Sequence, residues 1–538
     1  MTIAKLALDQ AGRVVVIDDQ LGTSTGAPKI AAQAYDSTYQ ALWVDTGAVA
    51  AADGRNNGLR FTTAGALRVY DATAGLPATT NTHLGMAMTT DGQVCITSGA
   101  STSPYVLNGV AMTNDGRVYV DILSFALEFA DLGAGVVSTV EAIGAATPTF
   151  TRATAATTVL STGLIGAVAS GDPRSYYDPT TLEYLGYLAE GARTNLCLQS
   201  ETLDVDGAGA PWDAAQASIS ADATVAPDGT TTADKIVEDA SAASLHRNFQ
   251  VIVATGGIPY TASVFVKAAE RTWINLSIPN IVNGNCYFNI GTGVIGTPGA
   301  AATATSIKQY PAGWYRCSVT ATTTVAFAGI DVELATGNGV ATYDGDGVSG
   351  LYAWGAQIEA AAFASSYIPT TTLAVARNAD VLTYPTTAFD LSTLSGTFFA
   401  EWQVFDVADT ARKLALSFTN ATGNERFEAR SDQDSATDSA IVYGTGSGVV
   451  QLTKVGGVLS NTTYKLAFAY GSSGGAASWN GATVVSSATA SDFGAQAAFA
   501  VGSTTAGTVS NFGPIRRVAY YQARLPNAVL QALTNGSR

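Results

Sequence analysis

The sequence predicts an all-β protein in which a region of β-hairpin repeats precedes two β-sandwich domains. Only 13% of the 538 residues are charged, 55 are Gly and 47% are hydrophobic, which disfavours long solvated helices and a charged disordered chain. Hairpin-like patterns recur near the N-terminus, and alternating runs separated by Gly, Pro and Asn clusters follow them. At roughly 100 to 200 residues per domain, the chain is long enough for three or four domains.

Residues 1–122 contain the repeated unit. Gly85–Ile96 (GMAMTTDGQVCI) matches Gly109–Val120 (GVAMTNDGRVYV) at seven of twelve positions, and weaker copies begin at Leu6 and Leu59. Each copy has two alternating runs around a Gly that follows Asp or Ala, which is typical of a hairpin whose turn needs a positive φ. Units of about 25 residues cannot bury a face alone. We therefore expect four hairpins that stack on neighbours or on other chains, with a single compact β domain as the alternative.

After the repeats, the sequence predicts a connector, a series of strands and a short final helix. Residues 123 to about 147 form a connector, whose amphipathic segment SFALEFADL is compatible with a short helix. Clear strand patterns then begin at Tyr260 (YTASVFVKA), Trp273 (WINLSI), Gly313 (GWYRCSVTATTT) and Leu351 (LYAWGAQIE), and from about Ser392 in GTFFAEWQVF, KLALSF, ERFEAR, TYKLAFAY and RRVAYYQARL. This spacing favours β-sandwiches over alternating β and α units. The final segment, LPNAVLQALTNG, predicts a short helix that ends before Gly536.

The charge and the cysteine content limit the kinds of partner and the cellular location that the sequence predicts. The net charge is −16, from 27 basic and 43 acidic residues, so most of the surface repels nucleic acid. The four cysteines, Cys95, Cys197, Cys286 and Cys317, form no CxxC pair and predict neither a zinc site nor a disulfide framework. The first residues lack the apolar run of a signal peptide, and the longest apolar stretch is interrupted by acidic residues. We expect neither export nor insertion into a membrane.

The sequence predicts that the chain is not an enzyme, with no catalytic residue, no metal site and no cofactor. The two histidines, His83 and His246, have no partner pattern nearby, and the GxSxG and GxGxxG matches lack the helix that their chemistry needs. A glycan hydrolase would need two carboxylates about 5 to 10 Å apart, for which the strand residues Glu359, Glu401, Glu425 and Glu428 are candidates. The acidic loops at Asp344 and Asp346 and at Asp432, Asp434 and Asp438 are read as solvated turns, and calcium binding there stays open.

A string of motifs between residues 147 and 385 resembles a known type of module. The motifs are TPTFTRATAATTV, DPRSYYDPTTLEYLGYLAEGARTNL, VAPDGTTTADKI, YTASVFVKAAERTW, GWYRCSV and GLYAWGAQIEAAAFASSYIPTTTLAVARNADVL. In this order they resemble a module of bacteriophage and prophage tail fibres and virion-associated proteins, whose central part is similar to carbohydrate-binding jelly rolls. The region from about Gly396 to the closing RVAYYQARLPNAVLQALT resembles concanavalin A and laminin G type lectin sandwiches.

The resemblance implies a domain plan and a role. It divides the chain into a hairpin region (1–122), a connector with the start of a lectin-like region (123–195), a jelly roll (196–372) and a lectin-like domain (373–538), with the jelly roll inserted in the lectin fold as one possibility. It implies a homotrimeric fibre, spike or decoration protein on the virion surface, made in the host bacterial cytoplasm. The hairpin region would contact other virion proteins of the capsid or the tail, and the sandwiches would contact a host glycan. A decoration protein that binds no sugar and a polysaccharide depolymerase are the alternatives.

Sugar recognition rests on aromatic faces that stack on pyranose rings, with polar groups beside them. Trp212, after Pro211, and Trp479, in GAASWNGAT, are predicted to lie in loops and to bind the glycan, followed by Tyr343 beside Asp344. The other aromatic candidates are Trp273, Trp314, Tyr315, Trp354 and Trp402, of which Trp314 and Trp354 are expected in the core.

Overall fold

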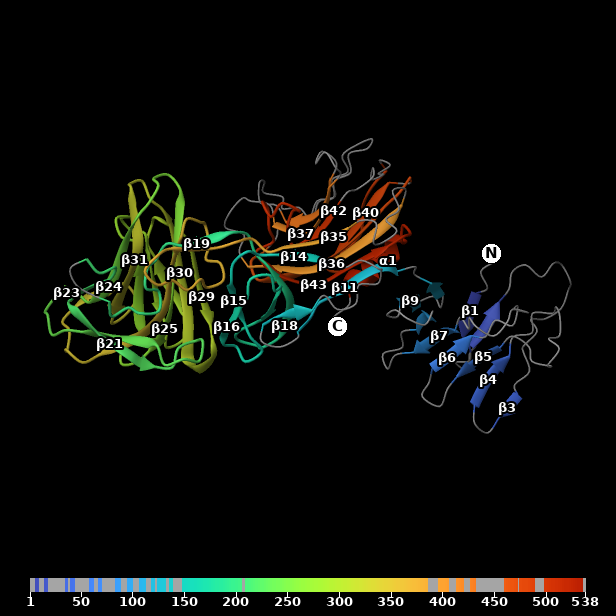
Figure 1. The fold of residues 1–538 in the computed structure, drawn as a ribbon, viewed down its shortest axis with the longest axis horizontal. Helices are drawn as coiled ribbons and strands as arrows, with labels where there is room; N and C mark the ends of the chain where they lie inside the picture. The colour runs from blue at the N-terminus through green and yellow to red at the C-terminus, as the bar shows by residue number, and fades with distance from the viewer. Residues whose placement is uncertain are drawn as a thin grey trace.

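The computed structural model describes strand backbone in the first 147 residues and most of the chain after them. The described residues are 5–8, 14–17, 34–36, 39–43, 58–61, 66–69, 83–88, 94–99, 106–112, 118–120, 123–131, 135–138, 148–205, 209–385, 395–405, 413–419, 426–431, 459–472, 474–488 and 498–535. Their regular structure is β, apart from one α-helix, α1 (Asn527–Asn535), and a 3-10 turn, η1 (Pro311–Gly313). This confirms the predicted all-β class (Figure 1).

The N-terminal strands pair in an antiparallel manner. β1 (Lys5–Leu8) pairs with β2 (Val14–Ile17), and the other strands follow one another in a single sheet. That sheet contains β3 (Ala34–Asp36), β4 (Tyr39–Trp43), β5 (Gly58–Phe61), β6 (Ala66–Val69), β7 (His83–Met88), β8 (Val94–Gly99), β9 (Val106–Met112) and β10 (Val118–Val120). The pairs β1–β2, β5–β6, β7–β8 and β9–β10 coincide with the four repeats of the sequence, while the turns between them lie outside the described residues.

One sandwich, here called the split sandwich, is built from two distant parts of the chain. Its first sheet has the order β17 (Arg174–Tyr177), β18 (Tyr184–Ala189), β43 (Gly513–Tyr521), β36 (Gly396–Val404), β39 (Thr462–Tyr470), β40 (Gly475–Trp479) and β41 (Val485–Ser487), and β11 (Leu123–Glu128) also pairs with β43. Its second sheet has the order β14 (Thr149–Thr151), β35 (Val381–Pro385), β42 (Ala498–Val501), β37 (Lys413–Thr419) and β38 (Arg426–Ser431). Strands from before residue 190 and from after residue 380 therefore share both sheets.

The segment SFALEFADL is a strand and not a helix. β11 and β18 lie end to end along one edge of β43, with Glu128 opposite Arg517 and Tyr187 opposite Ile515. The open edge of β43 supplies backbone partners that a short isolated helix would lack, so tertiary pairing overrides the local pattern.

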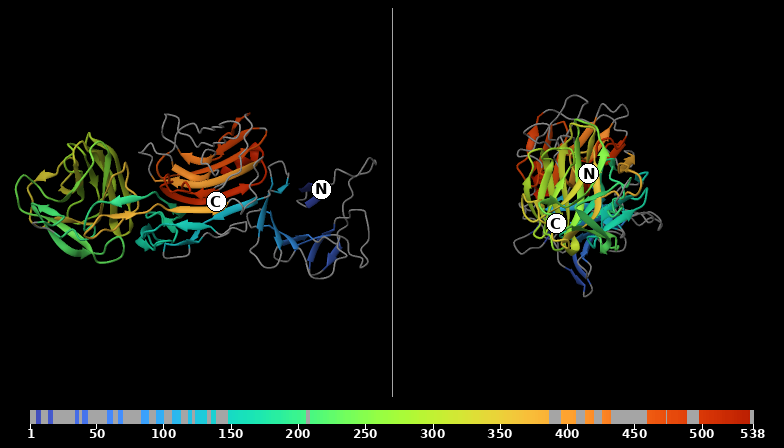
Figure 2. Two further views of the ribbon diagram at one scale, coloured as in Figure 1. Left: turned by 45° about the horizontal axis from the view of Figure 1, so that its top comes forward. Right: turned by 90° about the vertical axis from the view of Figure 1, so that its left-hand side faces the viewer.

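The second sandwich, here called the insert, occupies residues 213–359 between the two parts of the split sandwich. Its distal sheet has the order β20 (Asp213–Ala215), β24 (Arg247–Val253), β31 (Phe327–Ala335), β26 (Trp273–Ser277), β27 (Asn285–Asn289) and β28 (Val294–Pro298). Its proximal sheet has the order β21 (Ala217–Thr224), β22 (Ala233–Glu238), β33 (Gly350–Glu359), β25 (Pro259–Ala268), β30 (Trp314–Thr322) and β29 (Ala302–Gln309). The proximal sheet faces the split sandwich, and the two sandwiches lie in line (Figures 1 and 2).

Short strand pairs complete the fold, and each sandwich has its own core. The short pairs are β12 (Ala130–Asp131) with β13 (Val137–Ser138), β15 (Ala156–Val159) with β16 (Ile165–Val168), β19 (Arg193–Asn195) with β34 (Val375–Arg377), and β23 (Ser244–Leu245) with β32 (Thr342–Tyr343).

Ile274, Ile330 and Val332 are fully buried between the sheets of the insert. The predicted C-terminal helix, α1, covers the split sandwich through Val529 and Leu530. None of the helices in the described part of the chain is long and apolar enough to cross a membrane.

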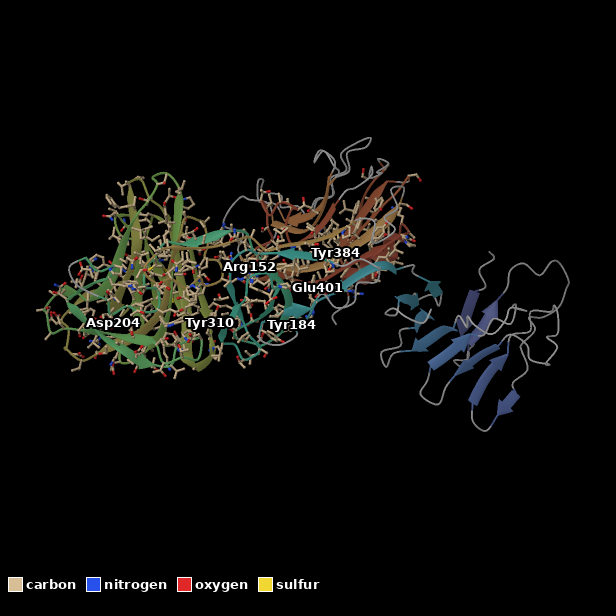
Figure 3. The ribbon with its side chains drawn as sticks, in the orientation of Figure 1. Arg152, Tyr184, Asp204, Tyr310, Tyr384 and Glu401 are labelled. Carbon is tan, nitrogen blue, oxygen red and sulfur yellow. The ribbon has the colours of Figure 1, made fainter. Side chains whose placement is uncertain are left out.

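A buried ionic network, here called the neck network, holds the place where the chain enters and leaves the insert. Arg152 donates to Asp380 over 2.9 Å, and Arg174 pairs with both Asp380 and Glu190. Arg377 pairs with the same Glu190 over 2.8 Å, and all five side chains have no exposed surface. Figure 3 places Arg152 between the two sandwiches. Because each buried charge is paired, the network is stable as a unit and depends on every member.

We expect the neck network to make the protein acid-labile. The neighbouring arginines and the hydrogen bonds from Ser366 lower the pKa of Glu190 from 4.5 to about 2 against the opposing effect of burial. A carboxyl whose folded pKa is depressed contributes stability above its unfolded pKa, and this contribution is lost as the pH falls from about 4.5 toward 2. Melting temperatures measured across this range should fall, and less steeply in Glu190→Gln. A wild-type melting temperature independent of pH below 4.5 would contradict this role.

Candidate functional site

The outer face of the distal sheet gathers acidic, amide and aromatic side chains. On β31 the residues Ile330, Val332 and Leu334 point into the core, so the alternation of a strand turns Asp331 and Glu333 to the outer face. The same alternation places the following residues on this outer face, which we call the distal face: Arg247, Phe249, Val251 and Val253 of β24, Trp273, Asn275 and Ser277 of β26, and Asn285, Tyr287 and Asn289 of β27.

The strand register arranges these residues in rows. Glu333 lies between Arg247 and Asn275, and Asn275 lies opposite Tyr287 on the next strand. In the adjacent row Asp331 lies between Phe249 and Ser277, and Ser277 lies opposite Asn285. The site therefore needs four strands that are brought together only by the sheet.

Hydrogen bonds fix the polar groups of the distal face in place. Asn275 donates to Glu333 Oε2 over 2.7 Å, and Asn285 donates to Asn275 Oδ1 over 2.7 Å. Arg247 donates to Asp331 Oδ2 over 2.7 Å while its guanidinium lies over the ring of Phe249, 4.5 Å from the ring centre. Asn275 and Arg247 thus each hold a carboxyl oxygen in a defined position, and Asn285 orients the Asn275 amide.

One carboxyl oxygen of the distal face has no hydrogen-bond partner. Asp331 is 2% exposed, and its Oδ1 finds no partner among the described residues. Burial and the neighbouring Glu333 raise the pKa of Asp331 against the opposing effect of Arg247, and burial also raises the pKa of Glu333. A buried polar atom without a partner is costly, so Oδ1 of Asp331 would gain from a further hydrogen bond. Two adjacent carboxyls with raised pKa values can both accept from and donate to ligand hydroxyls.

Aromatic rings flank these carboxyls. Trp273, Phe249 and Tyr287 are partly exposed, unlike the five tryptophans that are buried in the described part of the chain. Gly296 of β28 leaves room for the Trp273 ring, because a Cβ atom at Gly296 would lie 2.9 Å from a ring carbon. Flat rings next to hydrogen-bonding groups match the alternation of apolar faces and hydroxyls on a sugar.

The distal face lies on the side of the insert away from the split sandwich, whereas the opposite side of the insert is covered. Strands β24 and β31 lie on the side of the insert that points away from the split sandwich (Figure 1). The proximal sheet is packed against the β15–β16 hairpin, where Phe265 and Trp314 share a buried cluster with Val159 and Ile165. The partly exposed side chains of the distal face, such as Trp273 and Tyr287, are therefore not covered by the split sandwich.

The two tryptophans predicted as ligand-binding loop residues are buried. Trp212 is 1% exposed in the core of the insert, where its indole donates to the Gln199 carbonyl over 3.1 Å. Trp479 is 2% exposed and lies on strand β40, so its predicted loop position is wrong. The small residues around Trp479 that suggested a loop instead pack as buried strand residues, since Ala476 and Ala477 are fully buried. Neither indole presents a face to a ligand in this structure.

The other two predicted ligand-binding residues lie at the β22 and β33 end of the insert, apart from the distal face. Tyr343 is half-buried and donates to Glu238 Oε2 over 2.6 Å, and the Arg271 guanidinium lies 5.2 Å from its ring centre. Asp344 is exposed and accepts a hydrogen bond from the Ala243 backbone over 2.7 Å. These contacts fasten β32 and its neighbouring loops to one another.

We expect Tyr343→Phe to destabilise the insert by about 1 to 2 kcal/mol, because it removes one hydrogen bond to a buried carboxylate. Glu238 keeps its hydrogen bonds from Arg271 and from the Asp346 backbone, which limits the loss. Urea unfolding followed by tryptophan fluorescence measures the effect. Asp344→Ala is the matched control and should cost less, because Asp344 is exposed. Equal stability of Tyr343→Phe and the wild type would show that this contact contributes nothing.

The remaining sequence candidates do not converge on one site. His246 is fully buried, with Nδ1 2.7 Å from the Gln216 carbonyl oxygen, and Glu359 is a buried acceptor for Ser365. Glu401 lies 3.9 Å from Lys465. The side chains of His83, Glu425, Glu428, Asp432, Asp434 and Asp438 lie outside the described residues. In the GxGxxG match, Asp346 accepts from the backbones of Val348 and Ser349, which makes the segment a turn before β33.

Comparisons with known proteins give distant structural similarities. The chain is similar to a tandem CBM22 domain of Xyn10C from Paenibacillus barcinonensis, at 10% identity and a TM-score of 0.19, over 62% of this chain and 97% of that one. It is also similar to the Trypanosoma rangeli sialidase with the inhibitor DANA (8% identity, TM-score 0.23, 89% of each chain) and with sialic acid (9%, 0.22, 89% of this chain and 82% of that one). No protein-family model and no curated protein matches the chain.

These similarities correct one prediction from the sequence. The chain was predicted not to be an enzyme, and the sialidases among the similar structures are enzymes, which contradicts that prediction. The likeness lies at the level of β architecture and assigns no reaction to this chain.

Proposed function

We propose that this chain is a bacteriophage virion surface protein that attaches to a host-cell glycan through the distal face. The observation that carries the proposal is the combination of the partly exposed Trp273 ring with the fixed carboxyls of Asp331 and Glu333, one of which has an unpartnered oxygen. In this account the rings stack on the apolar side of a sugar, while the carboxyls and Asn289 bind its hydroxyls. The resemblance of the motifs in residues 147–385 to phage fibre modules supports the virion role.

The remaining parts of the chain fit this role as follows. The N-terminal hairpins attach the chain to other virion proteins, and three copies assemble into a homotrimer at the virion surface. The three distal faces of one homotrimer raise the local concentration of binding sites, so that weak sugar contacts add up to firm attachment. The chain is made in the host cytoplasm before assembly.

A binding assay with a matched control tests the glycan-binding role. The purified full chain is applied to an array of bacterial lipopolysaccharide and capsular oligosaccharides, and binding is compared with Trp273→Ala and Tyr184→Ala. Tyr184 is a partly exposed aromatic residue of the split sandwich, so its loss should leave binding unchanged. We expect Trp273→Ala alone to lose binding. Binding that survives in Trp273→Ala, or is absent from the wild type on every host glycan, would contradict the role of the distal face.

A glycan hydrolase is the second candidate, and one observation favours it. Asp331 and Glu333 point to the same side of one strand, and from the rise per residue of a strand their backbones lie about 6.6 Å apart. The pKa values of both carboxyls are raised. A protonated carboxyl beside an ionised one is the pair that glycoside hydrolysis uses. Release of reducing ends from a bound glycan, absent in Glu333→Gln, would favour this candidate over binding alone.

A further inference from the structure

A polar cavity lies at the junction of the two sandwiches. It has a volume of about 110 Å³ and lies between strands β29 and β30 of the insert, the β15–β16 hairpin, residues 364–367, and Phe405 and Asn461 of the split sandwich. Figure 3 shows Tyr310, one of its lining residues, on the side of the insert that faces this hairpin. We call this cavity the junction pocket, and it is separate from the distal face.

The charged residues that line the junction pocket are basic, in contrast with the chain as a whole. Lys308 and Arg316 line it, and its lining includes no Asp or Glu, although the chain carries a net charge of −16. Lys308 is partly neutralised by Asp178, 2.7 Å away. Arg316 is the stronger feature, because it forms no ion pair within the described part of the chain.

Neutral partners hold the Arg316 guanidinium at the pocket wall. One terminal nitrogen donates to the Ser365 carbonyl over 2.7 Å, and the other donates to Ser263 Oγ over 3.0 Å. Its Nε is buried and finds no hydrogen-bond partner among the described residues. A guanidinium that is fixed by neutral partners and has no counter-ion supplies an unbalanced positive charge at the pocket wall, which is suited to an incoming carboxylate.

The other polar groups of the junction pocket are also donors. The hydroxyls of Ser306 and Ser318 come from paired positions on β29 and β30. Tyr176 and Tyr310 add two phenols, and burial raises the pKa of both, so both stay protonated at neutral pH. Tyr176 packs against Phe405, with ring centres 4.9 Å apart, and supplies an aromatic wall. A pocket with hydrogen-bond donors, positive charge and an aromatic wall favours an anionic ligand that has an apolar surface next to its charged group.

We propose that the junction pocket binds the carboxylate and the near ring edge of a ligand such as an acidic sugar. A dry cavity of about 150 Å³ accommodates benzene, so the junction pocket takes a carboxylate together with the near edge of a ring. The carboxylate lies against Arg316, and the serine and tyrosine hydroxyls bind the remaining oxygens. A free sugar acid and the acidic end residue of a glycan share this chemistry. The proposal does not depend on the distal face.

Titration of the full chain with glucuronate tests the junction pocket. Calorimetry should show saturable binding of glucuronate, no binding of glucose, and weakening as salt is added. Arg316→Gln should weaken glucuronate binding by at least about tenfold, since a charge-assisted hydrogen bond is lost. Arg247→Gln is the matched control, because Arg247 lies on the distal face. No glucuronate binding to the wild type, or equal binding to Arg316→Gln, would overturn the proposal.

Two further measurements exclude simpler explanations. Ser306→Leu fills the junction pocket without changing Arg316 and should also abolish binding, so a folding defect of Arg316→Gln cannot account for both results. Oligosaccharides with glucuronate at the end or only in the interior separate the two sources of ligand. Binding of the oligosaccharide with glucuronate at its end identifies a glycan terminus as the ligand. Binding of the free acid alone identifies a small metabolite as the ligand. Retention of glucuronate binding in Trp273→Ala would show that the two sites are independent.

Discussion

Asp380→Asn should lower the free energy of unfolding by about 3 to 5 kcal/mol, the usual cost of removing one partner from a buried ion pair. Asp380 accepts hydrogen bonds from Arg152 and Arg174 and has no exposed surface, so neither guanidinium gains water when the charge is removed. The pair joins residues more than 200 positions apart in the sequence. The loss should therefore appear as early melting of the split sandwich.

Scanning calorimetry of the full chain measures this effect, and the chain offers a control. Glu183→Gln removes an exposed pair with Arg516, 3.1 Å apart, and should change stability by less than about 1 kcal/mol. If Asp380→Asn had the same melting temperature as the wild type, the neck network would be a weak contact and the two sandwiches would be held by packing alone.

Asp331→Leu should abolish most glycan binding while leaving the fold as stable as the wild type or more stable. The substitution removes a buried carboxyl oxygen that has no partner and relieves the repulsion by Glu333. Arg247, which loses its partner, is 32% exposed along its side chain and can be hydrated instead. Loss of a charged hydrogen bond to a ligand costs about 1.5 to 3 kcal/mol, or roughly 10- to 150-fold in affinity.

Affinity for the glycan and the melting temperature must be measured together on this variant. Asp331→Asn serves as the conservative comparison, because an amide oxygen still accepts from Arg247 while the charge is lost. A variant that loses stability but keeps its affinity would show that Asp331 is a structural residue and not part of a binding site.

The alternating patterns predicted many of the strands but not their partners. The runs at Tyr260, Trp273, Gly313 and Leu351 became β25, β26, β30 and β33, because each alternation matches a strand with one face in a core. The pairing of strands that lie far apart in the sequence left no comparable pattern in the residues. Phe150 lies opposite Leu382 although 232 residues separate them, and no local pattern encodes such a partner.

The distal face was missed for a physical reason. Asp331 and Glu333 alternate with Ile330, Val332 and Leu334, so each reads as the polar position of an ordinary half-exposed strand. Only the register with β24, β26 and β27 brings Arg247 and Asn275 beside them. Two acidic residues at alternate positions of an otherwise apolar strand were the available signal. Trp273 was recognised as a candidate aromatic residue. Trp479 was misplaced because its small neighbours suggested a loop, and Trp212, which was predicted to lie in a loop after Pro211, is buried.

Fluorine NMR of the full chain labelled with 5-fluorotryptophan tests the distal face most directly. The chain has seven tryptophans; Trp212, Trp314, Trp354, Trp402 and Trp479 are each at most 2% exposed, whereas Trp273 is partly exposed on the distal face. The spectrum is recorded during titration with a host oligosaccharide, and Trp273→Phe assigns the signal. The account predicts a saturable shift of the Trp273 signal, while the five buried tryptophans stay unchanged. Saturable glycan binding that leaves the Trp273 signal in place would contradict it.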